Sequence, residues 1–136
     1  MTDLRPATTA DTAILALHHY RALLSSGSSD AAATRAMTAF LPWARTELET
    51  GRLIAVIAGG LLEAAGSAVL HCTDRPTMLE RAELLFIYST EPSLEPALVS
   101  ALIAEARLRD MTSLLAKSAQ LAALGLQGTA LLEYRL

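Results

Sequence analysis

One short apolar run constrains the fold more than any other feature of the sequence. Leu53–Ala58 (LIAVIA) is rich in β-branched residues and is followed at once by Gly59-Gly60. A run of this length, closed by a turn signal, is typical of a buried strand that enters a tight turn. The return strand is expected over roughly Leu62 to Cys72, with Gly66 as a bulge or a point of close approach. The sequence therefore predicts a β-hairpin near the middle of the chain.

A strand and a long helix are expected after the hairpin. The run Ala82–Tyr88, which is apolar apart from Glu83, predicts a strand that is buried on both faces. Ser93 is the expected N-cap of a helix over Leu94–Arg109, with Pro96 in its first turn. The apolar positions of this helix share one face: Val99, Leu102, Ile103 and Ala106. The expected remainder is a strand over Ser113–Ala116, a small helix over Ser118–Leu124 and a strand over Thr129–Arg135.

Helices are expected before the hairpin. Thr8 and Asp11 have the spacing of a capping box, which predicts a helix over Ala10–Leu24. Asp30 is the expected N-cap of a further helical segment. Pro42 should break or kink that segment and open a second piece that ends near Gly51, because proline lacks an amide donor and suits a first turn.

Length and composition fit a single folded domain over residues 1–136. The chain is 52% hydrophobic and 18% charged, which is too apolar for a disordered protein. Its single cysteine, Cys72, allows no internal disulfide and no clustered zinc ligands. The net charge of −3 opposes binding to a phosphate backbone, so nucleic acid is not an expected partner.

No membrane or export segment is expected. The apolar stretch Leu53–Leu62 is shorter than the roughly 20 residues that a membrane-spanning helix needs. The first residues lack the basic start and apolar core of a signal peptide. We therefore expect a cytoplasmic protein that makes no membrane contact.

The order of these elements, together with local sequence, resembles the GNAT N-acetyltransferase superfamily. Three segments carry the resemblance: Leu4–Ala7 as an opening strand, Ala82–Tyr88 followed by Ala97–Arg107, and Leu124-Gly125-Leu126 in place of the usual Leu-Gly-Phe. The resemblance implies an α/β (α+β) fold with a central mixed, mostly antiparallel sheet flanked by about four helices.

The resemblance also implies transfer of an acyl group, usually acetyl, from an acyl-CoA cosubstrate to a small amine or a peptide amine, without a metal. Glu83 stands where some members carry a general base, and Tyr88 is a candidate acid at the thioester. The backbone groups implied to hold the acyl-CoA belong to Ile87, Tyr88, Ser89, Ser93 and Leu94.

Two motifs depart from the family pattern. Thr90–Glu95 stands where members carry the diphosphate-binding pattern Arg/Gln-x-x-Gly-x-Gly/Ala, and it brings two carboxylates and Pro92. Leu121 occupies the place of the usual tyrosine acid, and Leu114 or Ser118 that of an upstream asparagine.

These departures leave alternatives open. The first is a diverged N-acyltransferase. The second is a non-catalytic GNAT-like domain that binds a small ligand or a protein, as a homodimer through its sheet edge or its second helix. The third is a helical interaction protein unrelated to this family. His18 and His19 are expected to be ordinary surface or boundary residues in each case.

Overall fold

The computed structural model describes residues 3–60, 64–73, 81–109, 113–115 and 133–135. Its helices and strands follow one another in the order expected from the sequence. They are β1 (Leu4–Pro6), the 3-10 turn η1 (Thr9–Asp11), α1 (Thr12–Ser25), α2 (Asp30–Glu49), β2 (Leu53–Gly59), β3 (Ala64–Thr73), β4 (Arg81–Ser89), the 3-10 turn η2 (Pro92–Leu94), α3 (Glu95–Leu108), β5 (Ser113–Leu115) and β6 (Glu133–Arg135). The small helix expected over Ser118–Leu124 lies outside the described residues.

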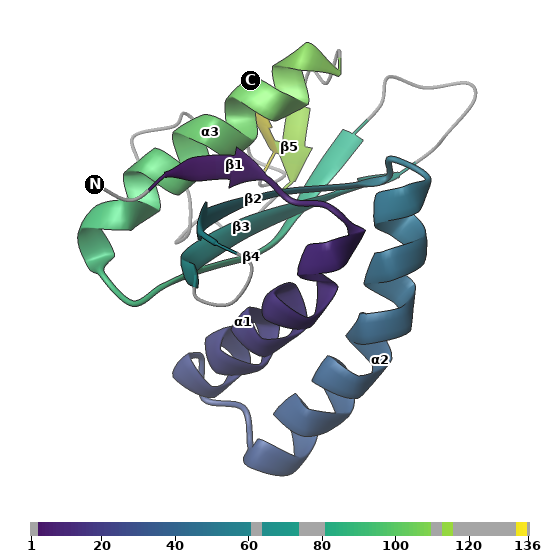
Figure 1. Cartoon of the computed structure of the whole chain (residues 1–136), viewed down its shortest axis with the longest axis vertical. Helices are drawn as coiled ribbons and strands as arrows, with labels where there is room; N and C mark the ends of the chain where they lie inside the picture. Colours follow the sequence, from purple (N-terminus) through teal and green to yellow (C-terminus); the bar gives the residue numbers. More distant parts are fainter. Residues whose placement is uncertain (1–2, 61–63, 74–80, 110–112, 116–132, 136) are drawn as a thin grey trace.

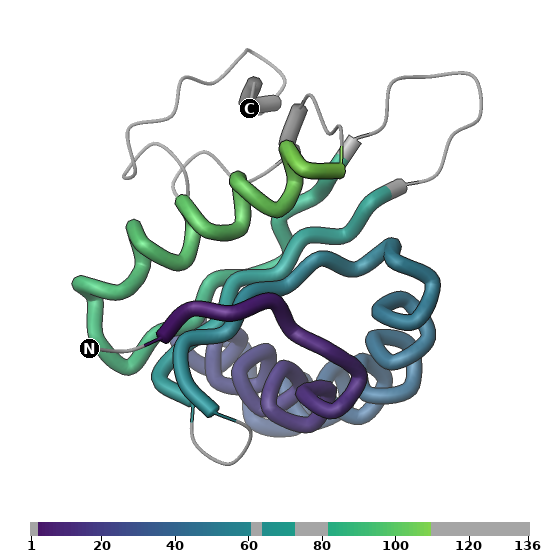
Figure 2. The backbone as a smooth tube through the Cα atoms, turned by 45° about the horizontal axis from the view of Figure 1, so that its top comes forward, coloured from purple at the N-terminus to yellow at the C-terminus, as the bar shows by residue number. Residues whose placement is uncertain are grey.

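The strands form one six-stranded sheet in sequence order, β1-β2-β3-β4-β5-β6. Neighbouring strands are antiparallel except β4 and β5, which are parallel. Helices α1 and α2 cover one face of the sheet and α3 covers the other (Figures 1 and 2). The expected mixed, mostly antiparallel sheet is confirmed, and the unrelated helical protein is excluded.

Strand β2 lies at the centre of both hydrophobic layers. Leu53 through Ala58 are all at most 3% exposed, which confirms the strand predicted from this run. Ile54, Val56 and Ala58 pack toward α3, whereas Leu53, Ala55 and Ile57 pack toward α1 and α2. Because successive side chains of a strand point to opposite faces, an uninterrupted apolar run is what a sheet between two helical layers requires.

Helix α2 corrects two expectations. Its N-cap is Ser29, whose hydroxyl accepts a hydrogen bond from the N–H of Ala32 at 3.1 Å, and not Asp30. The helix also runs through Pro42 without ending there. Pro42 and Thr38 are both exposed, so water can reach the Thr38 carbonyl that the proline leaves without an amide partner. Gly51 follows the helix with a φ of 79°, as expected for a residue just past a C-terminus.

Helix α3 confirms the expected apolar face and corrects its N-cap. Val99, Leu102, Ile103 and Ala106 are buried against the sheet, and Pro96 falls in the first turn. Ser93 does not cap the helix, because it lies inside η2 and the helix begins after Leu94, which has helical dihedrals.

Gly66 marks a close approach between β3 and β4. A Cβ atom at this position would lie 2.6 Å from the Tyr88 carbonyl oxygen and 3.0 Å from Leu98 Cδ1. The pairing of β2 with β3 also shifts here, since Ala58 pairs with Gly66 and Gly59 with Ala64. Both roles expected for Gly66 are therefore confirmed: it adjoins a bulge, and a side chain would not fit.

Strand β4 contains a second irregularity. Leu70 pairs with Leu84 and Val69 pairs with Phe86, so Leu85 is the extra residue of a bulge. A bulge reverses the alternation of side chains along the strand. Leu84 accordingly packs in the α3 layer, whereas Phe86 packs in the α1 and α2 layer. The expected burial on both faces is confirmed, and the bulge decides which residues reach which face.

We expect Gly66→Ala to lower the free energy of unfolding by about 1–3 kcal/mol, because the new methyl group would overlap the Tyr88 carbonyl. Gly60→Ala is the matched control, since no atom lies within 4 Å of a Cβ there and its φ is not positive. Urea unfolding of the two variants and the wild type measures the difference. Equal stability of both variants would contradict the tight approach.

Candidate active site

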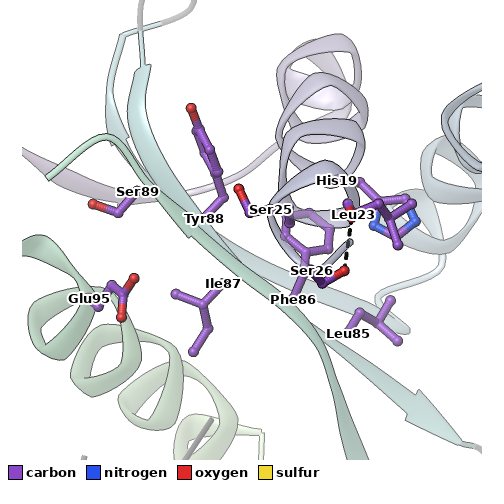
Figure 3. Close-up of a pocket in the computed structure, with 11 residues that line it drawn as sticks. His19, Leu23, Ser25, Ser26, Leu85, Phe86, Ile87, Tyr88, Ser89 and Glu95 are labelled. Carbon is purple, nitrogen blue, oxygen red and sulfur yellow. Dashed lines mark hydrogen bonds between the residues drawn. The ribbon is translucent and has the colours of Figure 1, made fainter. Parts of the chain in front are cut away.

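A pocket of about 360 Å³ opens where β4 ends, between the C-terminal half of α1 and the start of α3. Its floor is apolar and its rim is polar. The lining residues are His19, Ala22, Leu23, Ser25 and Ser26 from α1 and the turn after it, Leu85, Phe86, Ile87, Tyr88 and Ser89 from β4, and Glu95 from α3 (Figure 3). The volume lies at the small end of the roughly 300–1,000 Å³ range of small-molecule sites.

The pocket runs along an open edge of β4. Strand β5 pairs with β4 only from Arg81 to Glu83, so within the described residues β4 has no neighbour on that side from Leu84 to Ser89. Backbone N–H and C=O groups along such an edge are free to bond an extended ligand. The pocket thus combines an apolar surface with a row of backbone donors and acceptors.

Tyr88 is held from three directions. Its ring centroid lies 4.6 Å from that of His18, and the guanidinium carbon of Arg21 lies 5.9 Å from the same centroid. In the sheet register, Tyr88 pairs with Ser67 on β3. The side chain is half-buried and lines the pocket. The ring is therefore fixed at the boundary between the packed layer and the opening.

His18 ties α1 to the sheet beneath this ring. Its Nδ1 lies 2.8 Å from Ser67 Oγ, and both residues are buried, at 2% and 0% exposed. Burial, with a smaller effect of the Arg21 charge and an opposing hydrogen bond to the Ala64 backbone, lowers the pKa of His18 to about 4. The expectation of a surface or boundary residue is wrong for His18, which is a neutral cross-layer hydrogen-bonding residue.

His19 lies in the pocket itself. Its ring is packed between Phe40 and Phe86, with centroid distances of 5.0 and 5.1 Å, and its buried Nδ1 has no hydrogen-bond partner among the described residues. Burial lowers the pKa of His19, which keeps the imidazole neutral near pH 7. No sequence signal marks this position, because α1 carries apolar residues all round and the pattern does not distinguish its buried face.

The loop before α3 uses most of its own amides. The N–H of Thr90 donates to the Ala65 carbonyl at 2.8 Å, that of Glu91 to Ser89 Oγ at 3.0 Å, and that of Leu94 to the Glu91 carbonyl at 3.0 Å. The Glu95 N–H donates to the Pro92 carbonyl, and Pro92 has no N–H. Within this fully described loop, Ser93 alone is left to offer an amide to a ligand.

Some of the residues expected to carry function line the pocket, and others lie outside it. Ile87, Tyr88 and Ser89 line the pocket, whereas Ser93 and Leu94 do not. Glu83 also lies outside it, exposed on the α1 and α2 face of β4 and paired in register with His71. Of the positions that depart from the family pattern near the C-terminus, Ser118 and Leu121 lie outside the described residues, and only the backbone of Leu114 is described.

Two further features of the described residues concern metal ions and membranes. In the described part of the chain, no group of three or more His, Cys, Asp or Glu side chains lies close enough to hold a metal ion. No helix among these same residues has the length and apolar character to cross a bilayer.

Solved structures with the same arrangement are acetyltransferases. A GCN5-related N-acetyltransferase from Ralstonia eutropha aligns with a TM-score of 0.80 over 96% of this chain and 95% of its own, at 16% identity. The chain has the GNAT fold. A predicted acetyltransferase from Clostridium acetobutylicum with acetyl-CoA gives a TM-score of 0.77 at 18% identity, covering 96% of this chain and 92% of the other.

The likeness extends to an archaeal protein. The PaiA N-acetyltransferase from Thermoplasma acidophilum in complex with coenzyme A gives a TM-score of 0.67 at 11% identity, over 98% of the GNAT-fold chain and 96% of its own. No protein-family model and no curated protein sequence matches. At these identities the comparisons establish the fold, which is the one expected from the sequence.

The depressed pKa of His18 predicts a pH-dependent stability. Below pH 6.5 the unfolded chain binds a proton at His18 that the folded chain does not bind until about pH 4. The free energy of unfolding should therefore fall across this window, by about 2–3 kcal/mol from this residue. In the double variant His18→Met/Ser67→Ala this share of the pH dependence should disappear, as measured by urea unfolding between pH 7 and pH 4.

Other titrating groups are common to both proteins and cancel in the difference between them. An NMR titration that follows the His18 ring gives the pKa directly. Parallel stability curves for the wild type and the double variant, or a His18 pKa near 6.5, would contradict the neutral buried imidazole.

Proposed function

We propose that the chain is a diverged GNAT N-acyltransferase that moves an acyl group, most simply acetyl, from an acyl-CoA to an amine. The observation that carries this proposal is the pocket at the open edge of β4, where Ile87, Tyr88 and Ser89 meet the start of α3. The GNAT fold supports it, and so do the acetyl-CoA and coenzyme A held by similar structures. The proposed site of action is the cytoplasm.

The proposed reaction needs one bond formed and one broken. The nitrogen of a neutral amine attacks the thioester carbonyl, the C–N bond forms, the C–S bond breaks, and the amine proton leaves while the thiolate gains one. Tyr88 is proposed to donate a proton to the thiolate. Glu83 is proposed to accept the amine proton through water, because it shares a sheet face with Phe86 but lies outside the pocket.

The acceptor is proposed to be a small amine or a peptide amine. Among the described linings of the pocket, no cation is present to repel the ammonium form of such an acceptor. His19, neutral near pH 7, adds no opposing charge. If a second copy of the chain joins, the surfaces proposed for contact are the edge strand β1 and helix α2.

A second candidate function is a non-catalytic GNAT-fold domain that binds a small ligand. The observation that favours it is the loop before α3, where the amides of Thr90, Glu91, Leu94 and Glu95 are taken by acceptors within the protein. A diphosphate finds few donors there, and tight acyl-CoA binding in the family's usual way is not expected.

Calorimetric titration with acetyl-CoA separates the two candidates. The acyltransferase proposal expects measurable binding in the micromolar to low millimolar range, roughly −8 to −4 kcal/mol. Desulfo-CoA, which lacks the sulfur, controls for reaction with Cys72. Undetectable binding at millimolar acetyl-CoA would overturn the acyltransferase proposal and leave the binding domain.

Tyr88→Phe tests the proposed acid. With an amine acceptor that supports turnover, we expect kcat to fall by about a hundredfold or more, because the thiolate loses its proton donor. Tyr20→Phe is the matched control, since its hydroxyl bonds Asp30 on the surface outside the pocket. Steady-state kinetics with a thiol-release assay measures both variants. A Tyr88→Phe enzyme with unchanged kcat would remove Tyr88 from the mechanism.

A further inference from the structure

The pocket and the loop beside it differ in the chemistry that they can bind. The pocket offers apolar contact from Leu23, Leu85, Phe86 and Ile87, and backbone groups along the open edge of β4. The loop before α3 offers two exposed carboxylates, Glu91 and Glu95, and almost no unoccupied amide. A ligand that spans both meets favourable contacts at one end only.

Three features of the loop before α3 oppose the binding of an anion. The amides of Thr90, Glu91, Leu94 and Glu95 would first have to give up bonds within the protein. Pro92 and Pro96 have no backbone N–H to donate at the positions where a helix N-terminus binds phosphate. Both carboxylates would face the phosphate charge, and like charges at this range repel.

Among the described linings of the pocket, no cation compensates for these carboxylates. Arg21 is the cation that the structure brings to Tyr88, at 5.9 Å from the ring centroid. It belongs to α1, which covers the opposite face of the sheet from α3 (Figure 1). Among the described residues, its guanidinium contacts the Tyr88 ring and makes no contact with the loop before α3.

Resting on the proposed function, we infer that the chain recognises its donor as an uncharged acyl-pantetheine thioester, and that the diphosphate and nucleotide of CoA add nothing to binding. A pantetheine arm is mostly apolar and carries amide groups that can pair with the backbone of an exposed strand edge. The pocket of about 360 Å³ suits a ligand of that size better than a whole CoA molecule.

The inference predicts an unusual order of affinities. Acetyl-pantetheine should bind within about threefold of acetyl-CoA, because the additional charged part makes no net favourable contact. Raising the salt concentration should leave acetyl-pantetheine binding unchanged and should strengthen acetyl-CoA binding or leave it unchanged, because salt screens repulsion. A site that holds the diphosphate shows the opposite trend.

Variants that remove a carboxylate charge test whether the loop repels the diphosphate of acetyl-CoA. Glu91→Gln, at an exposed loop residue outside the pocket, should strengthen acetyl-CoA binding by about threefold and leave acetyl-pantetheine binding unchanged. Glu49→Gln is the matched control, since Glu49 is an exposed carboxylate on α2 that pairs with Arg45. The substituted side chains are exposed, and circular dichroism checks that each variant is folded.

Calorimetric titration of the whole chain with acetyl-CoA and with acetyl-pantetheine, at two salt concentrations, reads out binding without any assay of turnover. The inference is supported when both ligands bind with similar affinity and Glu91→Gln improves only acetyl-CoA binding. Acetyl-CoA that binds more than about thirtyfold tighter and weakens with salt overturns the inference but leaves the acyltransferase proposal intact. A loss of acetyl-CoA affinity alone in Arg21→Gln likewise overturns it. Absence of binding by both ligands overturns the proposed function together with the inference.

Discussion

The contact between β3 and β4 at Gly66 and Ser67 is the constraint on which the rest of the site depends. The Tyr88 carbonyl approaches so closely that position 66 has no room for a Cβ atom. One residue further along, Ser67 pairs with Tyr88 and bonds the buried His18 of α1. Backbone packing and a cross-layer hydrogen bond thus fix the end of β4 in the sheet and against the helix at once.

The bulge at Leu85 determines what that fixed strand end presents. Without the extra residue, the strict alternation of side chains would turn Phe86 and Tyr88 toward α3. With it, both residues face α1, where Phe86 packs on His19 and Tyr88 packs on His18. The pocket exists because an irregularity changes the face of the strand shortly after the described pairing of β4 with β5 ends at Glu83.

Many of the strands and helices were predictable because they depend on local sequence patterns. The apolar run Leu53–Ala58 and the apolar face of α3 are signals of burial that hold whatever lies around them. The site was harder to predict, because its residues depend on contacts between distant segments. In α1, Leu17 and Leu24 are more than a third exposed while His18 is buried. The hydrogen bond between His18 and Ser67, far apart in the sequence, explains why a histidine is buried there. The helix break expected at Pro42 is absent for a related reason, since exposure decides whether a proline inside a helix is tolerated.

The altered loop bears on affinity more than on chemistry. Contacts to a remote part of a substrate lower its dissociation constant, whereas the reacting atoms respond to groups that act in the transition state. Glu91 belongs to the loop that would meet the diphosphate end of the proposed donor, whereas Tyr88 and the open edge of β4 are proposed to meet its thioester end. A chain that lacks contacts to the diphosphate and keeps contacts to the thioester would bind its donor weakly and still transfer the acyl group. Loss of a diphosphate loop in a GNAT fold is therefore not, by itself, evidence that catalysis has been lost.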